Sequence, residues 1–205
     1  MTGEIDRAVE SLRFTGGPSI ECVTLKEGPP GIQSQLDVDS AVQPLCNFIR
    51  SQDSETSAFV IACFSDPGLQ AARHITTKPV LGIAECAMAT ALTRGDRFGI
   101  ISILENAIVR HRRMVRAAGL ESRFAADLAI DVGVQGLSNT DLVLERMIGV
   151  GNRLKRDHGA DVLIMGCAGM ACYREQLESA TGIPVIEPTR AAVTMAFGTL
   201  HSSGG

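Results

Sequence analysis

Short apolar runs alternate with stretches of helical period along almost the whole chain. The apolar runs predict strands at residues 19–25, 58–64, 79–83, 98–104, 126–132, 162–166 and 183–186. Helical spacing of apolar residues predicts helices at 2–13, 38–50, 85–92, 107–118, 139–158, 172–179 and 189–200, with a further helix opening at Asp66 or Pro67. Continuous, β-branched strands separated by helices are typical of parallel sheets covered on both faces. The pattern therefore predicts an α/β protein whose parallel sheets are flanked by helices.

The chain contains one arrangement twice. An apolar run leads to Cys63 and then to a Pro-Val strand at Pro79, and a second apolar run leads to Cys167 and then to Pro184. The spacing from cysteine to proline is 16 residues in the first copy and 17 in the second. A duplication of this kind indicates two pseudo-symmetric α/β lobes that face each other.

The lobe boundaries are expected at turns outside the two copies. We predict a first lobe of residues 1–94 together with 188–205, and a second lobe of residues 95–187, joined by short hinges near Arg94 and Pro188. The cleft between the lobes is then the expected site, because a cysteine would enter it from each side.

Composition and charge narrow the classes of partner. The formal net charge of −4 over 205 residues gives no basic footprint, which argues against nucleic acid. No apolar run approaches the roughly 20 residues that span a bilayer, and no signal peptide opens the chain. These features predict a cytoplasmic protein with a small-molecule substrate. The six cysteines include no Cys-x-x-Cys pair, which disfavours disulfide, zinc and redox sites.

Both Cys63 and Cys167 fall where a strand gives way to a helix. Free amide N–H groups there favour an anion such as a thiolate. Two thiols on opposite sides of a carbon next to a carbonyl would suit removal of a proton from one face and its return to the other. Ala168 and Gly169 are small enough to let a substrate approach the backbone, whose N–H groups would hold the charge on the carbonyl oxygen. The carbonyl is the electron sink, so no metal or organic cofactor is expected.

Four segments carry a resemblance to a known family. They are Gly28-Pro29 with Ile32-Gln-Ser34, Ala62-Cys-Phe-Ser-Asp-Pro-Gly-Leu69, Gly82-Ile-Ala-Glu85 and Gly166-Cys-Ala-Gly-Met170. Together they resemble the aspartate/glutamate/hydantoin racemase superfamily, in its hydantoin and allantoin racemase branch. The resemblance implies two α/β lobes with the site between them, cofactor-independent racemisation by Cys63 and Cys167, and a homo-oligomer. Members usually begin with a strand carrying Asn-Pro-Asn, and this sequence opens at Met1 without it. Either the chain begins upstream of Met1 or the first lobe lacks its usual first strand.

Further residues are candidates for substrate contact. Phe64 and Ser65 directly follow the first cysteine, and we expect both in the site. Glu85 and Glu187 occupy matching places after the Pro-Val strands, where a substrate N–H contact and a helix N-terminal carboxylate are equally good interpretations. Ser102 ends a predicted strand and could donate to substrate, although a purely structural strand-end hydroxyl is the simpler interpretation.

The remaining ionisable residues on predicted helices are expected at the surface. This applies to the four histidines at 74, 111, 158 and 201. It applies also to the basic cluster of Arg110, His111, Arg112, Arg113 and Arg116, which reads most simply as a solvated helix face.

Several functions remain open. Amino-acid racemases of the superfamily resemble Cys-x-Thr at both turns, whereas the turns here are Cys63-Phe-Ser and Cys167-Ala-Gly, which disfavours free aspartate or glutamate. Related decarboxylases keep one thiol, and resemblance to maleate isomerases would call for a site tyrosine, whereas the only tyrosine is Tyr173. Racemisation of a 5-substituted hydantoin or of allantoin is therefore favoured. An amino-acid racemase, a related isomerase or decarboxylase, and a two-lobed binding protein whose cysteines only pack remain the alternatives.

Overall fold

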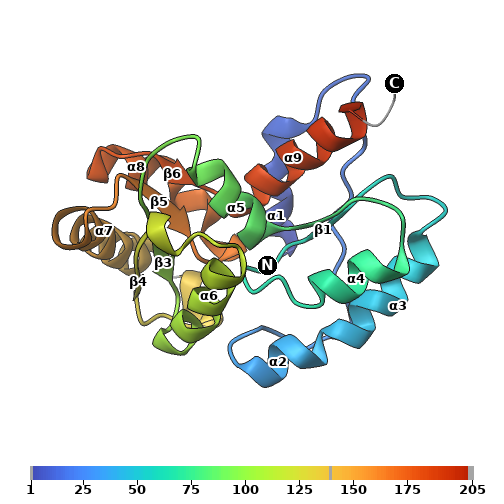
Figure 1. Ribbon diagram of the computed structural model, residues 1–205, viewed down its shortest axis with the longest axis horizontal. Coiled ribbons are helices and arrows are strands. Elements are labelled where there is room, and N and C mark those ends of the chain that lie inside the picture. Colours follow the sequence, from blue (N-terminus) through green and yellow to red (C-terminus); the bar gives the residue numbers. More distant parts are fainter. Residues whose placement is uncertain (1, 139, 203–205) are drawn as a thin grey trace.

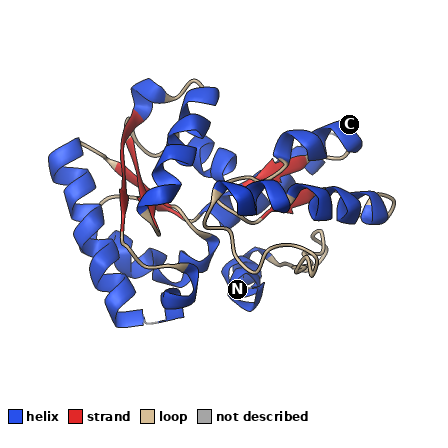
Figure 2. Cartoon of the chain, turned by 90° about the horizontal axis from the view of Figure 1, so that it is seen from below, coloured by secondary structure: helices blue, strands red, loops and turns tan. Residues whose placement is uncertain are grey.

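Two parallel β-sheets organise the computed structural model of the protein, which describes residues 2–138 and 140–202 (Figures 1 and 2). The first sheet pairs β1 (Phe59–Ile61) with β2 (Val80–Gly82). The second sheet has the strand order β4-β3-β5-β6, formed by β3 (Phe98–Ser102), β4 (Phe124–Ala129), β5 (Val162–Met165) and β6 (Val185–Ile186). The predicted α/β class with parallel sheets and flanking helices is confirmed.

Helices connect the strands and cover both sheets. The α-helices are α1 (Thr2–Val9), α2 (Gln35–Ser40), α3 (Val42–Gln52), α4 (Leu69–Ile75), α5 (Ile83–Ala91), α6 (Glu105–Ala117), α7 (Thr140–His158), α8 (Arg174–Thr181) and α9 (Pro188–Ser202). Short 3₁₀ helices are η1 (Glu10–Leu12), η2 (Glu121–Arg123), η3 (Val134–Ser138) and η4 (Ala168–Tyr173). Within the described residues, no helix combines the length and the apolar character needed to cross a membrane.

The second sheet is buried on both faces, as its continuous apolar strands require. Ile100 and Ile164 face a core cluster that includes residues of α5 and α9. Ile101 and Leu163, one position along each strand, face a separate cluster that includes Met147 of α7. Successive side chains on a strand point to opposite faces, so the same two strands hold both clusters together.

The first sheet is smaller and packs against different helices. Phe59, Ile61 and Val80 form a core cluster with Ile49 of α3 and Leu69 of α4. Figure 1 shows α3 and α4 together at one end of the molecule, away from α7 and α8. The last helix, α9, returns from the second sheet, packs against α5 and contacts β1. The lobe boundaries at residues 94 and 188 stay a prediction.

The strand predicted at 19–25 is wrong. These residues form no strand ladder in the structure, and Val23 is 46% exposed. A strand is stable only when a neighbouring strand satisfies its backbone N–H and C=O groups, and the described strands pair only with one another. The helix predicted to open at Asp66 or Pro67 begins later, at Leu69, because Asp66 and Gly68 hold left-handed backbone angles (φ 41° and 69°) in the preceding turn.

Gly166, between β5 and Cys167, lies against the neighbouring strand without room for a side chain. A Cβ at this position would stand 2.6 Å from the backbone oxygen of Ile101. Gly166→Ala is expected to lower the free energy of unfolding by about 1–3 kcal/mol, as overpacking does. Gly149→Ala on α7 is the matched control, because a Cβ there meets nothing within 4 Å and should be neutral or stabilising by up to about 1 kcal/mol. Urea unfolding of both variants measures the difference, and equal stabilities would contradict the packing argument.

Candidate active site

Cys63 and Cys167 line one cavity of about 180 Å³. Its wall is formed by residues 30–32, 62–65, 103, 107, 110, 111, 134 and 166–168. Pockets for drug-sized ligands are typically about 300–1,000 Å³, so this cavity suits a smaller substrate. The structure therefore brings together the two cysteines that the sequence duplication singled out, although they are far apart along the chain.

Each cysteine stands in a tight turn at the carboxyl end of a strand. After β1, the backbone N–H of Asp66 donates to the carbonyl oxygen of Cys63 at 2.9 Å; after β5, the N–H of Met170 donates to the carbonyl oxygen of Cys167 at 3.1 Å. In both turns the backbone N–H two residues after the cysteine, that of Ser65 or Gly169, donates to the sulfur. The two halves of the site therefore repeat one local geometry, as the duplicated sequence predicts.

Burial works against ionisation of both thiols. It raises the pKa of Cys63 to about 12 and that of Cys167 to about 11. The amide donors of Ser65 and Gly169 act in the opposite direction and lower these pKa values, as expected for N–H groups at a strand-to-helix turn. Desolvation is the larger effect, so the balance favours the neutral thiol of both cysteines at pH 7.

Most of the residues predicted to contact substrate beside the cysteines lie at the cavity, and Ser102 does not. Phe64, Ser65 and Ala168 line the cavity. Gly169 reaches the site through its backbone N–H. Ser102 lies outside the wall and is fully buried, and its hydroxyl donates to the carboxylate of Asp127 at 2.5 Å.

Glu187 makes the contacts of the helix N-terminal interpretation, whereas the Glu85 carboxylate pairs with an arginine. Neither residue lines the cavity. Glu85 pairs with Arg73 at 2.7 Å on a partly exposed surface. Glu187 is buried and accepts from the backbone N–H groups of Thr189 and Arg190 at 3.0 and 2.6 Å, at the start of α9. Burial raises the pKa of Glu187, and these N–H donors lower it.

Asp66 binds the N-terminus of α5, as Glu187 binds the N-terminus of α9. Its carboxylate accepts from the backbone N–H groups of Ala84 and Glu85 at 3.0 and 2.9 Å. Burial raises the pKa of Asp66 to about 6, against the lowering effect of these two donors. The carboxylate occupies the space next to Gly82, where a Cβ would come within 2.2 Å of it. Asp66 thus fixes the turn after Cys63 to the start of a helix that is distant in sequence.

The predicted surface position of Arg110 and His111 is wrong. Both line the cavity, with exposed fractions of 9% and 2%. His111 Nδ1 lies 2.8 Å from Asp127 Oδ2 and 3.0 Å from Ser102 Oγ, and its ring packs edge-on against Phe64 with centroids 5.0 Å apart. The predicted exposure of Arg112 and Arg113, next to them on α6, agrees with the structure.

The spacing of apolar residues around His111 indicates a buried position, although its basic neighbours suggest an exposed helix face. Ala107, His111 and Val115 are spaced by four, and all three are buried on one face of α6. Asp127 is one of two carboxylates in the predicted strand 126–132, the other being Asp131, and it has a relative exposure of 2%. A buried charge needs a partner, so an acidic residue among apolar strand positions indicates a histidine or arginine facing it.

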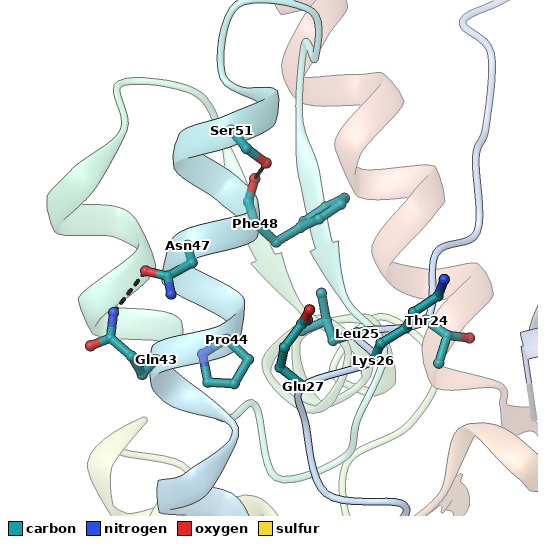
Figure 3. A pocket seen from close by; sticks show the side chains of 9 residues that line it. All are labelled: Thr24, Leu25, Lys26, Glu27, Gln43, Pro44, Asn47, Phe48 and Ser51. Atoms are coloured by element: carbon teal, nitrogen blue, oxygen red, sulfur yellow. Dashed lines mark hydrogen bonds between the residues drawn. The ribbon is translucent and has the colours of Figure 1, made fainter.

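A larger cavity of about 650 Å³ lies away from the cysteines. It is bounded by residues 24–27 and by α3 residues Gln43, Pro44, Asn47, Phe48 and Ser51. Figure 3 shows Phe48 extending from α3 towards the side of residues 24–27, with Gln43 hydrogen-bonded to Asn47. None of the predicted site residues lines this cavity. Over the described ranges, no cluster of three or more His, Cys, Asp or Glu side chains could hold a metal ion.

Comparison with known proteins assigns the class. Residues 1–196 match the family model described as Asp/Glu/Hydantoin racemase. The chain therefore belongs to the Asp/Glu/hydantoin racemase family, and it is a racemase, an isomerase that acts on a small molecule.

Individual relatives lie in one branch of that family. The chain is 32% identical over 199 residues to a hydantoin racemase of Paenarthrobacter aurescens, covering 96% of this chain and 84% of that protein. It is 35% identical over 170 residues to a hydantoin racemase of Rhizobium meliloti, covering 82% of this chain and 70% of that one. A solved allantoin racemase from Klebsiella pneumoniae superposes with a TM-score of 0.92 at 32% identity, over 99% of this chain and 83% of that one.

Alkylation kinetics test the burial of the two thiols. The thiolate is the species that reacts with iodoacetamide. At pH 7, Cys63 and Cys167 should therefore react more slowly than Cys172, the exposed thiol. Because the pKa values of Cys63 and Cys167 are raised to about 12 and 11, the alkylation rates of these two cysteines should rise about tenfold per pH unit up to about pH 10. Mass spectrometry of alkylated peptides measures each site, and rapid labelling of both at pH 7 would contradict the assignment of neutral thiols.

Proposed function

We propose that this racemase inverts the C5 centre of 5-substituted hydantoins or of allantoin, using Cys63 and Cys167 as two opposed acid–base groups. The observation that carries the proposal is the shared cavity, which both thiols line from equivalent turns. The hydantoin and allantoin racemases among the relatives support this ring class. The small volume of the cavity is consistent with a planar, five-membered ring.

The proposed reaction starts with one cysteine as thiolate and the other as thiol. The thiolate removes the C5 proton from one face, and the electron pair moves onto the neighbouring carbonyl oxygen to give an enolate. The opposite thiol then donates its proton to the other face of C5, which leaves that cysteine as the thiolate. Protons and charge balance, and the roles of Cys63 and Cys167 exchange when the other enantiomer binds. The ring carbonyl takes up the electrons, so the scheme invokes no metal or organic cofactor.

The environment of the thiols suits a weak carbon acid. A thiol of high pKa is scarce as thiolate at neutral pH but is a stronger base when ionised, which favours proton removal from carbon. The same N–H groups that face the sulfurs, those of Ser65 and Gly169, are placed to stabilise the negative charge that moves between thiolate and enolate. We assign Phe64, Ser65 and Ala168 to the walls around the ring.

Other features of the proposal rest on composition and family. Free cysteines fit a cytoplasmic enzyme, because thiols stay reduced there. A homo-oligomer is proposed from the family alone. The net charge of −4 supports a small molecule as the partner rather than nucleic acid.

Single cysteine variants test the two-base scheme. Cys63→Ser and Cys167→Ser should each reduce racemisation of an enantiopure 5-substituted hydantoin by at least about 100-fold, because a serine hydroxyl cannot replace a thiol as acid–base group. In D2O, each variant should still exchange the C5 proton of one enantiomer, and the two variants should prefer opposite enantiomers. Optical rotation and proton NMR follow the two processes separately.

Cys172→Ser is the matched control, since Cys172 lies outside the cavity wall and should leave racemisation unchanged. Full racemisation by either Cys63→Ser or Cys167→Ser would exclude the scheme. Parallel assays with allantoin, free aspartate and free glutamate separate the ring substrates from the amino-acid alternatives. Binding of a hydantoin without exchange of its C5 proton would favour the binding-protein alternative.

A further inference from the structure

Arg110 is a buried cation in the wall of the racemase cavity. It extends from α6, lines the cavity beside Cys63 and Ser65, and has a relative exposure of 9%. In the part of the chain that the structure describes, no carboxylate forms an ion pair with it. Buried charges in proteins are normally paired, so an unpaired guanidinium facing a cavity indicates that the missing anion is supplied by a ligand.

The hydrogen bonds that Arg110 makes are all to neutral acceptors. Its guanidinium donates to Ser65 Oγ at 3.5 Å and to the backbone oxygens of Gln33 at 3.4 Å and Asn106 at 3.2 Å. Good N–H···O bonds are about 2.7–3.2 Å long, so two of the three are long, and a guanidinium has five donors in a rigid fork, of which the two on Nη2 are left. The Asp37 carboxylate interacts with Arg110 through charge but forms no ion pair with it.

The neighbouring wall offers one further polar group to a ligand. His111 lines the same cavity, and its Nδ1 is taken by Asp127 and Ser102. The other ring nitrogen, Nε2, has no partner among the described residues, so it remains for a ligand. Asp127 is the carboxylate behind this wall, and its two oxygens already accept from Ser102 and His111.

We propose that Arg110 binds a carboxylate carried by the C5 substituent of the substrate. The preferred substrates are then hydantoins with a carboxymethyl or carboxyethyl group at C5, and this inference rests on the proposed racemisation of hydantoins. A carboxylate matches the planar fork of arginine through two parallel N–H···O bonds. The ring lies between the two cysteine turns, and its substituent extends along α6 towards Arg110.

A different role for Arg110 is to stabilise the thiolate of Cys63. The guanidinium does lower the pKa of that cysteine, but by charge alone, and burial still raises the pKa to about 12. The direct hydrogen bond to the Cys63 sulfur comes from the backbone N–H of Ser65. Thiolate stabilisation thus leaves the two Nη2 donors of Arg110 unused, whereas a carboxylate can accept from them.

Calorimetric titration with two matched ligands tests the proposal. Hydantoin-5-acetate and its primary amide, 5-(carbamoylmethyl)hydantoin, have nearly the same shape and differ in charge. The wild-type protein should bind the acid at least about tenfold more tightly than the amide, as expected for a charge-assisted, bidentate pair. Arg110→Met should bring the ratio of the two affinities to about one. Arg110→Lys, which keeps the charge but not the fork, should give an intermediate ratio.

Arg112→Met is the matched control, because Arg112 is an exposed cation two positions further along α6, and it should keep the wild-type ratio. Equal affinities in the wild-type protein, or no binding of the acid, would overturn the inference without relying on any variant. If the wild-type protein binds the two ligands equally well, and Arg110→Met shifts the pH dependence of racemisation, the role of Arg110 is instead to stabilise the thiolate of Cys63.

A separate assay distinguishes this inference from the proposed function. Racemisation of the neutral 5-methylhydantoin by the wild-type protein, without preference for the acid, would retain the proposed function and overturn the role of Arg110. Preferential binding of the acid that Arg110→Met abolishes, with no hydantoin racemised, would retain the carboxylate site and overturn the proposed reaction.

Discussion

Two partly buried thiols, each facing an amide N–H of its own turn, impose the constraint on which the proposed mechanism depends. Desolvation opposes ionisation of Cys63 and Cys167, since it is the largest effect on both and raises their pKa values. The N–H groups of Ser65 and Gly169 oppose it and make a transient thiolate accessible. Acid–base chemistry on carbon depends on fixed dipoles of this kind, aimed at the position where charge develops.

Buried carboxylates anchor the two helices α5 and α9, and one of them also belongs to a cysteine turn. Asp66 accepts from the first N–H groups of α5, and Glu187 accepts from those of α9. The two helices pack against each other and share a core cluster with the central strands. Because Asp66 also belongs to the turn after Cys63, the position of that cysteine is coupled to this helix pair. The structural role of acidic residues near the site is therefore to anchor helices.

Features encoded locally were predicted well from the sequence. Continuous apolar strands identified β1, β2, β3, β5 and β6 within a few residues, and the repeated spacing singled out the two cysteines that the structure brings to one cavity. The strand expected at 19–25 failed because strand formation depends on a neighbour that local sequence does not specify. Glu85 and Glu187 were matched by position, whereas the structural counterpart of Glu187 is Asp66.

Charge density misled the interpretation of α6. Arg110 and His111 belong to a basic run whose other members are exposed, so composition suggested one solvated face. The four-residue spacing of Ala107, His111 and Val115 hints at the buried face, and the pairing of His111 with Asp127 and Ser102, between α6, β4 and β3, establishes it. Arg110 and His111 have the same residue types as their exposed neighbours in the basic run and differ from them only in burial. Burial depends on how the whole chain folds, so residue type alone does not predict it.

The most direct measurement is a crystal structure of the protein with a planar hydantoin analogue that cannot lose a proton. The account predicts that the Sγ atoms of Cys63 and Cys167 lie on opposite faces of the ring, each within about 4 Å of the same ring atom. Two sulfurs on one face of the ring, or one sulfur beyond contact with that atom, would contradict the two-base mechanism.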